Sequence, residues 1–188
     1  MPGLKPSQPG TEKTARIARW VRIVVFAAMG IAILRFMWTY KTVHVPSYDD
    51  QMAPTLEPGD RMLVHRGMVE ASDFSRGEMV VYAVSSAEGV TLRFGRVAGV
   101  PGDRVQVTTE PGREVLVNGE PAAYAPVLQS PMKPVDKGGV EKRDPVRVPE
   151  GSLFLVNDNL YSDIADSRKL GPIPQSAFAG KIVMSLSW

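Results

Sequence analysis

The stretch Gln51-Met52-Ala53-Pro54-Thr55-Leu56-Glu57-Pro58-Gly59-Asp60-Arg61-Met62-Leu63-Val64 decides the fold of this chain. Pro54 fixes its own φ angle and biases Ala53 toward an extended backbone, and the Pro-Gly-Asp triplet at 58–60 is a turn signal. The apolar run that closes the stretch predicts a strand. A turn that feeds a strand, with apolar side chains available for burial, holds the preceding residue at a fixed place on a β platform. Gln51 is therefore a candidate functional position.

Four blocks of sequence resemble the signature of the type I signal peptidases, which are membrane-anchored serine proteases. In chain order, they are residues 52–60, 76–82, 96–103 and 157–174. The resemblance implies an all-β fold, a signal-peptidase-like coiled sheet or barrel domain with a small inserted cap, preceded by one N-terminal transmembrane helix. Short Val-rich runs separated by Gly, Pro, Asn or Asp turns independently predict such a β domain. The predicted strands are 42–46, 61–65, 78–84, 90–97, 104–108, 114–117, 152–156 and 180–186.

Both residues of the family's catalytic dyad are absent. The resemblance places the serine nucleophile at Gln51 and the lysine general base at Gly95. An amide is neither nucleophilic nor basic, and glycine has no side chain, so the family's reaction, in which a lysine accepts the serine proton, cannot occur here. In many family members, a small or hydroxyl residue two positions before the serine helps to bind the oxyanion. Here that residue is Asp49, whose carboxylate would repel the developing negative charge, so the three departures together indicate loss of catalysis.

A relocated nucleophile is the alternative. Ser47 lies upstream of Gln51 in a run that also resembles the family, and the nearby candidate bases are His44, His65, Asp49 and Asp50. Arg93 shares a strand face with Gly95, but a guanidinium does not lose its proton in proteins and cannot serve as the base.

Other matched residues predict support and binding. The resemblance implies that Asp166 and Arg168 pair, that Ser167 lies near the base position, and that Ser162 corresponds to a base-supporting serine in a block one residue longer than usual. It also implies that an extended peptide adds to the strands at 43–47 and 79–84. Four apolar residues are candidates to line this groove and are explained equally well as core: Met52, Met79, Val81 and Val97.

The N-terminal part predicts a membrane anchor. Residues 1–17 are predicted as a cytoplasmic tail, and the first 14 are rich in Pro, Gly and charge, as is typical of disordered segments. A helix over 18–40 is predicted to cross the membrane, because Arg22 and Arg35 can extend outward from its short apolar run. No small-residue cleavage site follows, which disfavours a cleaved signal sequence. The surplus of Lys and Arg before the helix predicts a cytoplasmic N-terminus and places residues 41–188 outside the cytoplasmic membrane, with 121–149 as an inserted loop or cap.

Composition restricts the possible partners. The chain has 22 Lys and Arg against 20 Asp and Glu, no Cys and only two His. These counts indicate no nucleic-acid surface and no disulfides, and we expect neither a metal nor a cofactor. The expected partners are a peptide segment of a secreted or membrane protein and the lipid bilayer.

Three functions remain at this point. The favoured one is a catalytically inactive signal-peptidase-like membrane protein that binds an extended peptide or a partner protein at the outer face of the cytoplasmic membrane. The alternatives are a divergent active peptidase that uses Ser47, and a structural subunit of an envelope complex.

Overall fold

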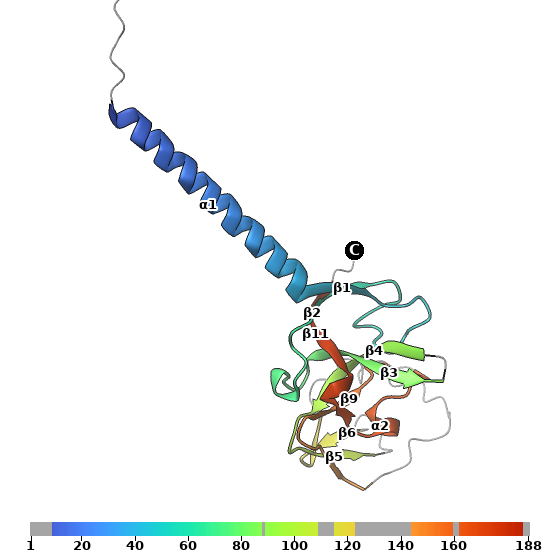
Figure 1. Cartoon of the computed structure of the whole chain (residues 1–188). Helices are drawn as coiled ribbons and strands as arrows, with labels where there is room; N and C mark the ends of the chain where they lie inside the picture. Colours follow the sequence, from blue (N-terminus) through green and yellow to red (C-terminus); the bar gives the residue numbers. More distant parts are fainter. Residues whose placement is uncertain (1–8, 88, 109–114, 123–143, 160–161, 186–188) are drawn as a thin grey trace, which may run out of the picture. The chain divides into compact units, whose positions relative to one another are not determined.

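A computed structural model describes residues 9–87, 89–108, 115–122, 144–159 and 162–185. The chain divides into two compact units, Met1–Thr39 and Tyr40–Trp188 (Figure 1).

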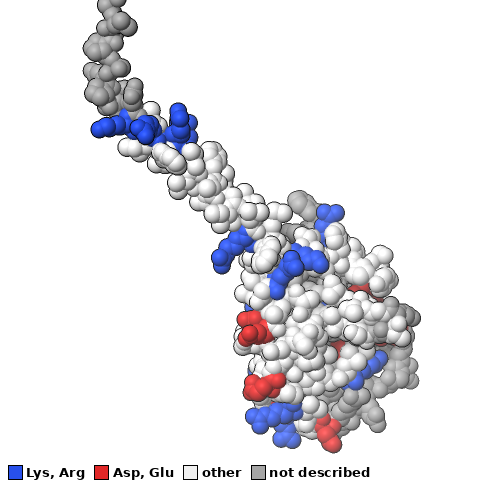
Figure 2. Space-filling view, in the orientation of Figure 1, with Lys and Arg blue, Asp and Glu red and all other residues white. Residues whose placement is uncertain are grey.

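The first unit contains the helix α1, Pro9–Thr39. Its segment Lys13–Thr39 is long and apolar enough to cross a membrane. Figure 2 shows basic side chains gathered at one end of this helix, followed by a stretch without charged side chains. The helix begins earlier than the predicted residue 18, so the expected disorder is wrong for residues 9–14. Proline is favourable in the first turn of a helix, and residues 11–17 contain no further Gly or Pro to end it.

The second unit is built on a seven-stranded antiparallel sheet in the order β1-β2-β11-β3-β4-β9-β10. Its strands are β1 Tyr40–His44, β2 Arg61–His65, β3 Met79–Ser86, β4 Gly89–Gly99, β9 Ser152–Val156, β10 Ile173–Pro174 and β11 Phe178–Ser185. The mostly-β fold with one apolar N-terminal helix is thereby confirmed.

A smaller antiparallel sheet has the order β7-β6-β5-β8. It contains β5 Arg104–Val107, β6 Val115–Val117, β7 Glu120–Pro121 and β8 Val146–Arg147. The predicted insert, residues 121–149, contains β8 and the second residue of β7, and its residues 123–143 lie outside the described part of the chain.

Three short helical turns complete the unit: η1 Ala71–Asp73, α2 Ser167–Leu170 and η2 Gln175–Ala177. None of them was predicted, and neither were the two-residue strands β7, β8 and β10. Elements this short do not produce a hydrophobic period in the sequence.

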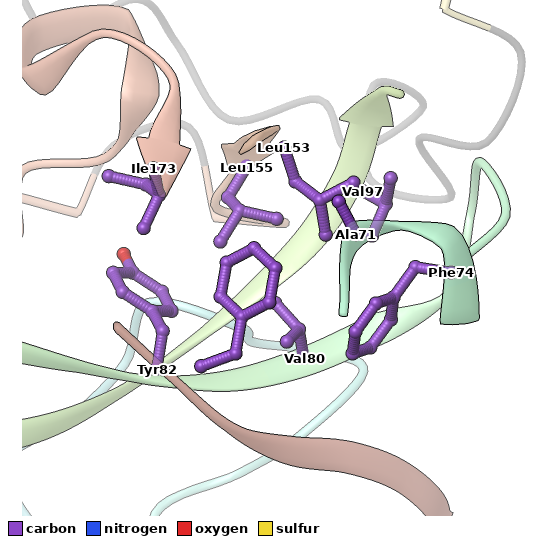
Figure 3. Packing of buried hydrophobic residues seen from close by; sticks show 9 residues of the cluster. Ala71, Phe74, Val80, Tyr82, Val97, Leu153, Leu155 and Ile173 are labelled. Carbon is purple, nitrogen blue, oxygen red and sulfur yellow. The ribbon is translucent and has the colours of Figure 1, made fainter. Parts of the chain in front are cut away.

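The two faces of the β3–β4 ladder point into different apolar clusters, because side chains alternate along a strand. Val80, Tyr82 and Val97 belong to the cluster drawn in Figure 3. Val81 and Phe94 face the opposite way and pack with Met52. A third cluster lies between the small sheet and the far end of β4. The candidate site lies where the loop before β2 meets β4.

Candidate functional site

Two hydrogen bonds from Gln51 to the Asp49 carboxylate, called the Asp49–Gln51 clasp below, close the loop that carries Gln51. Gln51 is fully buried. Its backbone N–H donates to Asp49 Oδ1 at 3.1 Å and its Nε2 donates to Asp49 Oδ2 at 2.8 Å. Both carboxylate oxygens are therefore occupied by position 51. The remaining amide oxygen, Oε1, is buried without a hydrogen-bond partner among the described residues.

The Asp49 carboxyl is itself almost inaccessible, with 4% of its surface exposed. Burial raises the pKa of Asp49 above its ordinary value, although the Gln51 hydrogen bonds and the Arg93 charge act in the opposite direction. A buried acceptor at this position cannot stabilise an oxyanion, because that task needs donors aimed at the developing charge.

The predicted base position, Gly95, has no side chain, and a side chain placed there would be crowded by its neighbours. Gly95 lies on β4 opposite Val80 of β3. A Cβ atom added at Gly95 would lie 3.1 Å from Leu155 Cβ and 3.3 Å from Tyr82 Cε1. The Tyr82 ring, which is fully buried, thus lies against the place where a side chain at position 95 would begin.

Tyr82 cannot replace the missing base. Burial, with a contribution from the charge of Asp166, raises the pKa of Tyr82 to about 12. The phenol is therefore neutral at physiological pH, and its oxygen has no hydrogen-bond partner among the described residues.

The predicted ion pair between Asp166 and Arg168 is present. Arg168 Nη2 lies 2.7 Å from Asp166 Oδ2, and both side chains are buried. Asp166 also caps α2 by accepting from the Arg168 backbone N–H at 2.9 Å, and it accepts from Asn157 N at 2.8 Å. The pair therefore joins the start of α2 to the end of β9, which is a structural role.

Ser167 and Ser162 support the backbone around the two dyad positions. Ser167 Oγ accepts from Leu155 N at 2.9 Å, which fixes the residue that faces Gly95. Ser162 Oγ donates to Asp50 Oδ1 at 2.8 Å, so this serine contacts the loop of Gln51. The same loop is held by Asn159, whose backbone N–H donates to Gln51 O at 2.9 Å.

Ser47 is exposed in the turn before the clasp, and no candidate base hydrogen bonds to it among the described residues. The Asp49 carboxylate is bound by Gln51, and the Asp50 carboxylate accepts from Ser162. His44 is an exposed residue at the end of β1. His65 pairs with Tyr40 at the opposite end of the β1–β2 ladder, where the two rings meet edge to face at 5.1 Å.

The four predicted groove residues are placed mainly in the core. Met52, Val81 and Val97 are buried, with exposures of 0–1%. Met79 is only partly buried and packs against the cluster that contains Met52. Peptide contact at these residues stays a prediction. The expected addition of a peptide strand at 79–84 is wrong for residues 80–82, because β3 pairs there with both β4 and β11.

Arg96 is a site residue that the sequence reasoning did not single out. Its guanidinium binds both oxygens of Asp158, with Nε at 2.6 Å from Oδ1. Nη1 donates to Gly77 O at 2.7 Å, and Nη2 reaches Thr55 Oγ1 at 3.4 Å. One side chain thereby joins all four sequence blocks. The sequence feature that could have identified Arg96 is its place at the start of a matched block, directly after Gly95.

One backbone edge beside the site has no partner strand among the described residues. The β4–β9 ladder begins at Arg96, whereas the β3–β4 ladder runs from Gly89 to Arg96. Within the described part of the chain, residues 90–95 consequently pair with a strand on one side only (Figure 1). Arg93 lies in this edge, and its Nη1 donates to Ala165 O at 2.8 Å. No group of three His, Asp or Glu side chains that could hold a metal occurs among the described residues.

Comparisons with known proteins match the sequence of this chain to a family. The family model described as signal peptidase, peptidase S26, matches residues 17–188. A signal peptidase I of Bacillus licheniformis is 28% identical over 177 residues, which cover 92% of this chain and 90% of that protein. A signal peptidase I of Leptolyngbya laminosa is 28% identical over 191 residues, with 97% and 87% covered. A crystal structure of a signal peptidase I from Enterococcus faecalis V583 has 22% identity and a TM-score of 0.43, covering 58% of this chain and 97% of that chain. The resemblance of the four sequence blocks is confirmed, and the chain belongs to the signal peptidase family, peptidase S26.

Proposed function

We propose that this chain is a catalytically inactive member of its family that binds an extended peptide segment of a secreted or membrane protein. The observation that supports the loss of catalysis is that other side chains occupy the surroundings of both predicted dyad positions, Gln51 and Gly95. Asp49 clasps the Gln51 amide, and the Tyr82 ring packs at Gly95. Acyl transfer by this route needs a nucleophile next to a base, and neither group is present at these positions.

The open edge of β4 supports peptide binding. An extended segment that adds to a sheet edge gains backbone hydrogen bonds without any catalytic group. Residues 90–94 offer such an edge directly before Gly95, the predicted base position. Because Gln51 is fully buried, we expect the bound segment to lie along β4 and not to contact the Gln51 side chain.

The apolar helix supports membrane attachment. Basic residues precede its apolar part, and such residues favour the cytoplasmic side of a membrane. In this orientation, the β unit lies at the outer face of the cytoplasmic membrane.

A cleavage and binding assay tests the proposal. The full chain in detergent is incubated with a preprotein that carries an Ala-x-Ala site, and a fluorescent peptide from the same region is titrated by anisotropy. We expect no cleavage, saturable peptide binding, and loss of binding when alternate backbone nitrogens of the peptide are methylated. Methylation removes the donors needed for strand addition, while it leaves the side chains unchanged.

The other outcomes identify the alternatives. Cleavage that disappears in Ser47→Ala would establish the relocated peptidase. Absence of both cleavage and binding would favour the third hypothesis, a structural subunit of an envelope complex. Equal binding of the methylated peptide would refute strand addition at β4.

A further inference from the structure

A second surface feature lies apart from the Gln51 loop. It is a depression of about 510 Å³ beside Ala71 and Phe74, which belong to the same apolar cluster as Tyr82. Its walls are η1, the turn after β4, the turn before β9 and the first residue of η2. Figure 3 places Phe74, which lines the depression, and Tyr82 on opposite sides of this cluster. The volume falls within the range of small binding sites.

The floor of the depression is apolar and firmly packed. Ala71, Phe74 and Val100 line it. The Phe74 ring packs edge to face against Phe178, with the centroids 5.6 Å apart. An apolar side chain that enters the depression would therefore meet a formed surface.

One polar group on the rim is held in a fixed orientation. Gln175 Oε1 accepts from Ala71 N at 3.1 Å, and Gln175 N donates to Gly151 O at 2.8 Å. With the oxygen engaged, the amide nitrogen Nε2 is the group left for a ligand, and no described residue accepts a hydrogen bond from it. This nitrogen suits a backbone carbonyl of a bound segment.

The charge around the depression is acidic. Glu150 lines it directly, and Glu70 precedes η1, where it lies 3.5 Å from Ser72 Oγ. Neither carboxylate forms an ion pair with a described residue. The one nearby cation, the Lys181 ammonium, lies 5.8 Å from the Phe74 ring centroid, and its charge is paired with Glu78 at 2.7 Å. Such a rim disfavours phosphate groups and acidic segments, and it favours a cationic ligand.

We propose that this depression binds an extended segment of a partner protein in which a Lys or Arg stands next to an apolar residue. The apolar side chain fills the space over Phe74, the cation lies beside Glu150, and a backbone carbonyl accepts from Gln175 Nε2. This site is separate from the β4 edge and adds a second contact to the proposed peptide binding.

Titration of labelled hexapeptides against the full chain in an uncharged detergent tests this inference. The peptides are acetylated and amidated, and they differ only in a central Leu-Lys, Leu-Glu or Ala-Lys pair. We expect the Leu-Lys peptide to bind and the other two to bind at least about five-fold more weakly, because each lacks one of the two contacts. A photo-reactive group on the same peptide is expected to label residues of the depression.

Three variants locate the site on the protein. Glu150→Lys reverses a rim charge and is expected to weaken binding of the Leu-Lys peptide about three- to ten-fold. Ser72→Trp fills the depression from an exposed position and is expected to abolish binding. Glu57→Lys makes the same charge change at an exposed turn elsewhere, and it is expected to have no effect.

Thermal unfolding of each variant shows whether the fold is retained. Equal binding of the Leu-Lys and Leu-Glu peptides would overturn the inference, as would unchanged binding in folded Glu150→Lys or the absence of saturable binding. Titration of a preprotein peptide that contains no Lys or Arg reports on the β4 edge in the same preparations, so failure at one site is distinguished from failure at the other.

Discussion

Replacing Gly95 with alanine probes whether the base position of the family has been filled. The new Cβ would lie 3.1 Å from Leu155 Cβ and 3.3 Å from Tyr82 Cε1. Carbon atoms pack best at about 3.5–4.0 Å, so both contacts are too short. Neither neighbour moves easily, because the Cβ of Leu155 is attached to a central strand and the Tyr82 ring is fully buried.

The size of the effect follows from two opposing terms. Overpacking of a filled core costs about 1–3 kcal/mol. Gly95 does not have a positive φ angle, so alanine adopts its backbone without strain and recovers about 0.4–1 kcal/mol from reduced freedom of the unfolded chain. We therefore expect Gly95→Ala to lower the free energy of unfolding by about 1–2 kcal/mol.

Urea unfolding of the full chain in detergent, followed by circular dichroism, measures this change. The midpoint should fall while the slope stays the same, because the surface exposed on unfolding is unchanged. In a Tyr82→Leu background, which removes the ring, the cost of Gly95→Ala should shrink, and the double-mutant cycle gives the coupling energy. A neutral or stabilising Gly95→Ala, or a cycle without coupling, would refute the conclusion that the Tyr82 ring restricts position 95.

Three further predictions concern the same site. The double variant Gln51→Ser with Gly95→Lys is expected to stay inactive toward a preprotein, because the lysine side chain meets the Tyr82 ring. The triple variant that adds Tyr82→Ala should cleave more preprotein than the double variant. Equal inactivity of the two variants would count against this explanation. Arg96→Met leaves Asp158 buried without its partner and should cost about 3–5 kcal/mol in urea unfolding, whereas the exposed Arg66→Met should change little. The pKa of Tyr82 rises from 10.0 to about 12 in the folded protein, so its contribution to stability is complete below pH 10 and is lost as the pH rises toward 12. Tyr82→Phe should abolish this part of the alkaline loss, on the order of 3 kcal/mol, and an unchanged alkaline profile would contradict it.

The sequence predicted the main sheet well because its strands are Val-rich and bounded by turn residues. The bounds of β2 and β9 agree with the prediction, and the other strands of the main sheet that were predicted differ by a few residues. The start of α1 was misplaced because composition averages over a window, whereas a helix begins at a particular residue, here Pro9.

The candidate site was predicted only in part. The matched blocks located Gln51, Asp49 and Gly95, because each is defined by its distance along the chain from a motif. The role of Tyr82 was not predictable in this way, because the contact with Gly95 depends on packing between strands and not on spacing along one strand. The same reason explains why Arg96 was missed: its three partners, Thr55, Gly77 and Asp158, come from segments far apart in the sequence.

The arrangement around Arg96 also explains how the fold can persist without the dyad. The guanidinium joins Thr55, Gly77 and Asp158 through hydrogen bonds that involve neither position 51 nor position 95. A neutral lysine at position 95 would have to be kept in an apolar environment, and burial of an amine that retains its charge is costly. With glycine at position 95 and the Tyr82 ring packed against it, no amine has to be buried there. The hydrogen bonds between Asp49 and Gln51 hold the loop at position 51. The bonds that hold the four blocks together are thus separate from positions 51 and 95, so the packing of this scaffold does not depend on a serine and a lysine at those positions.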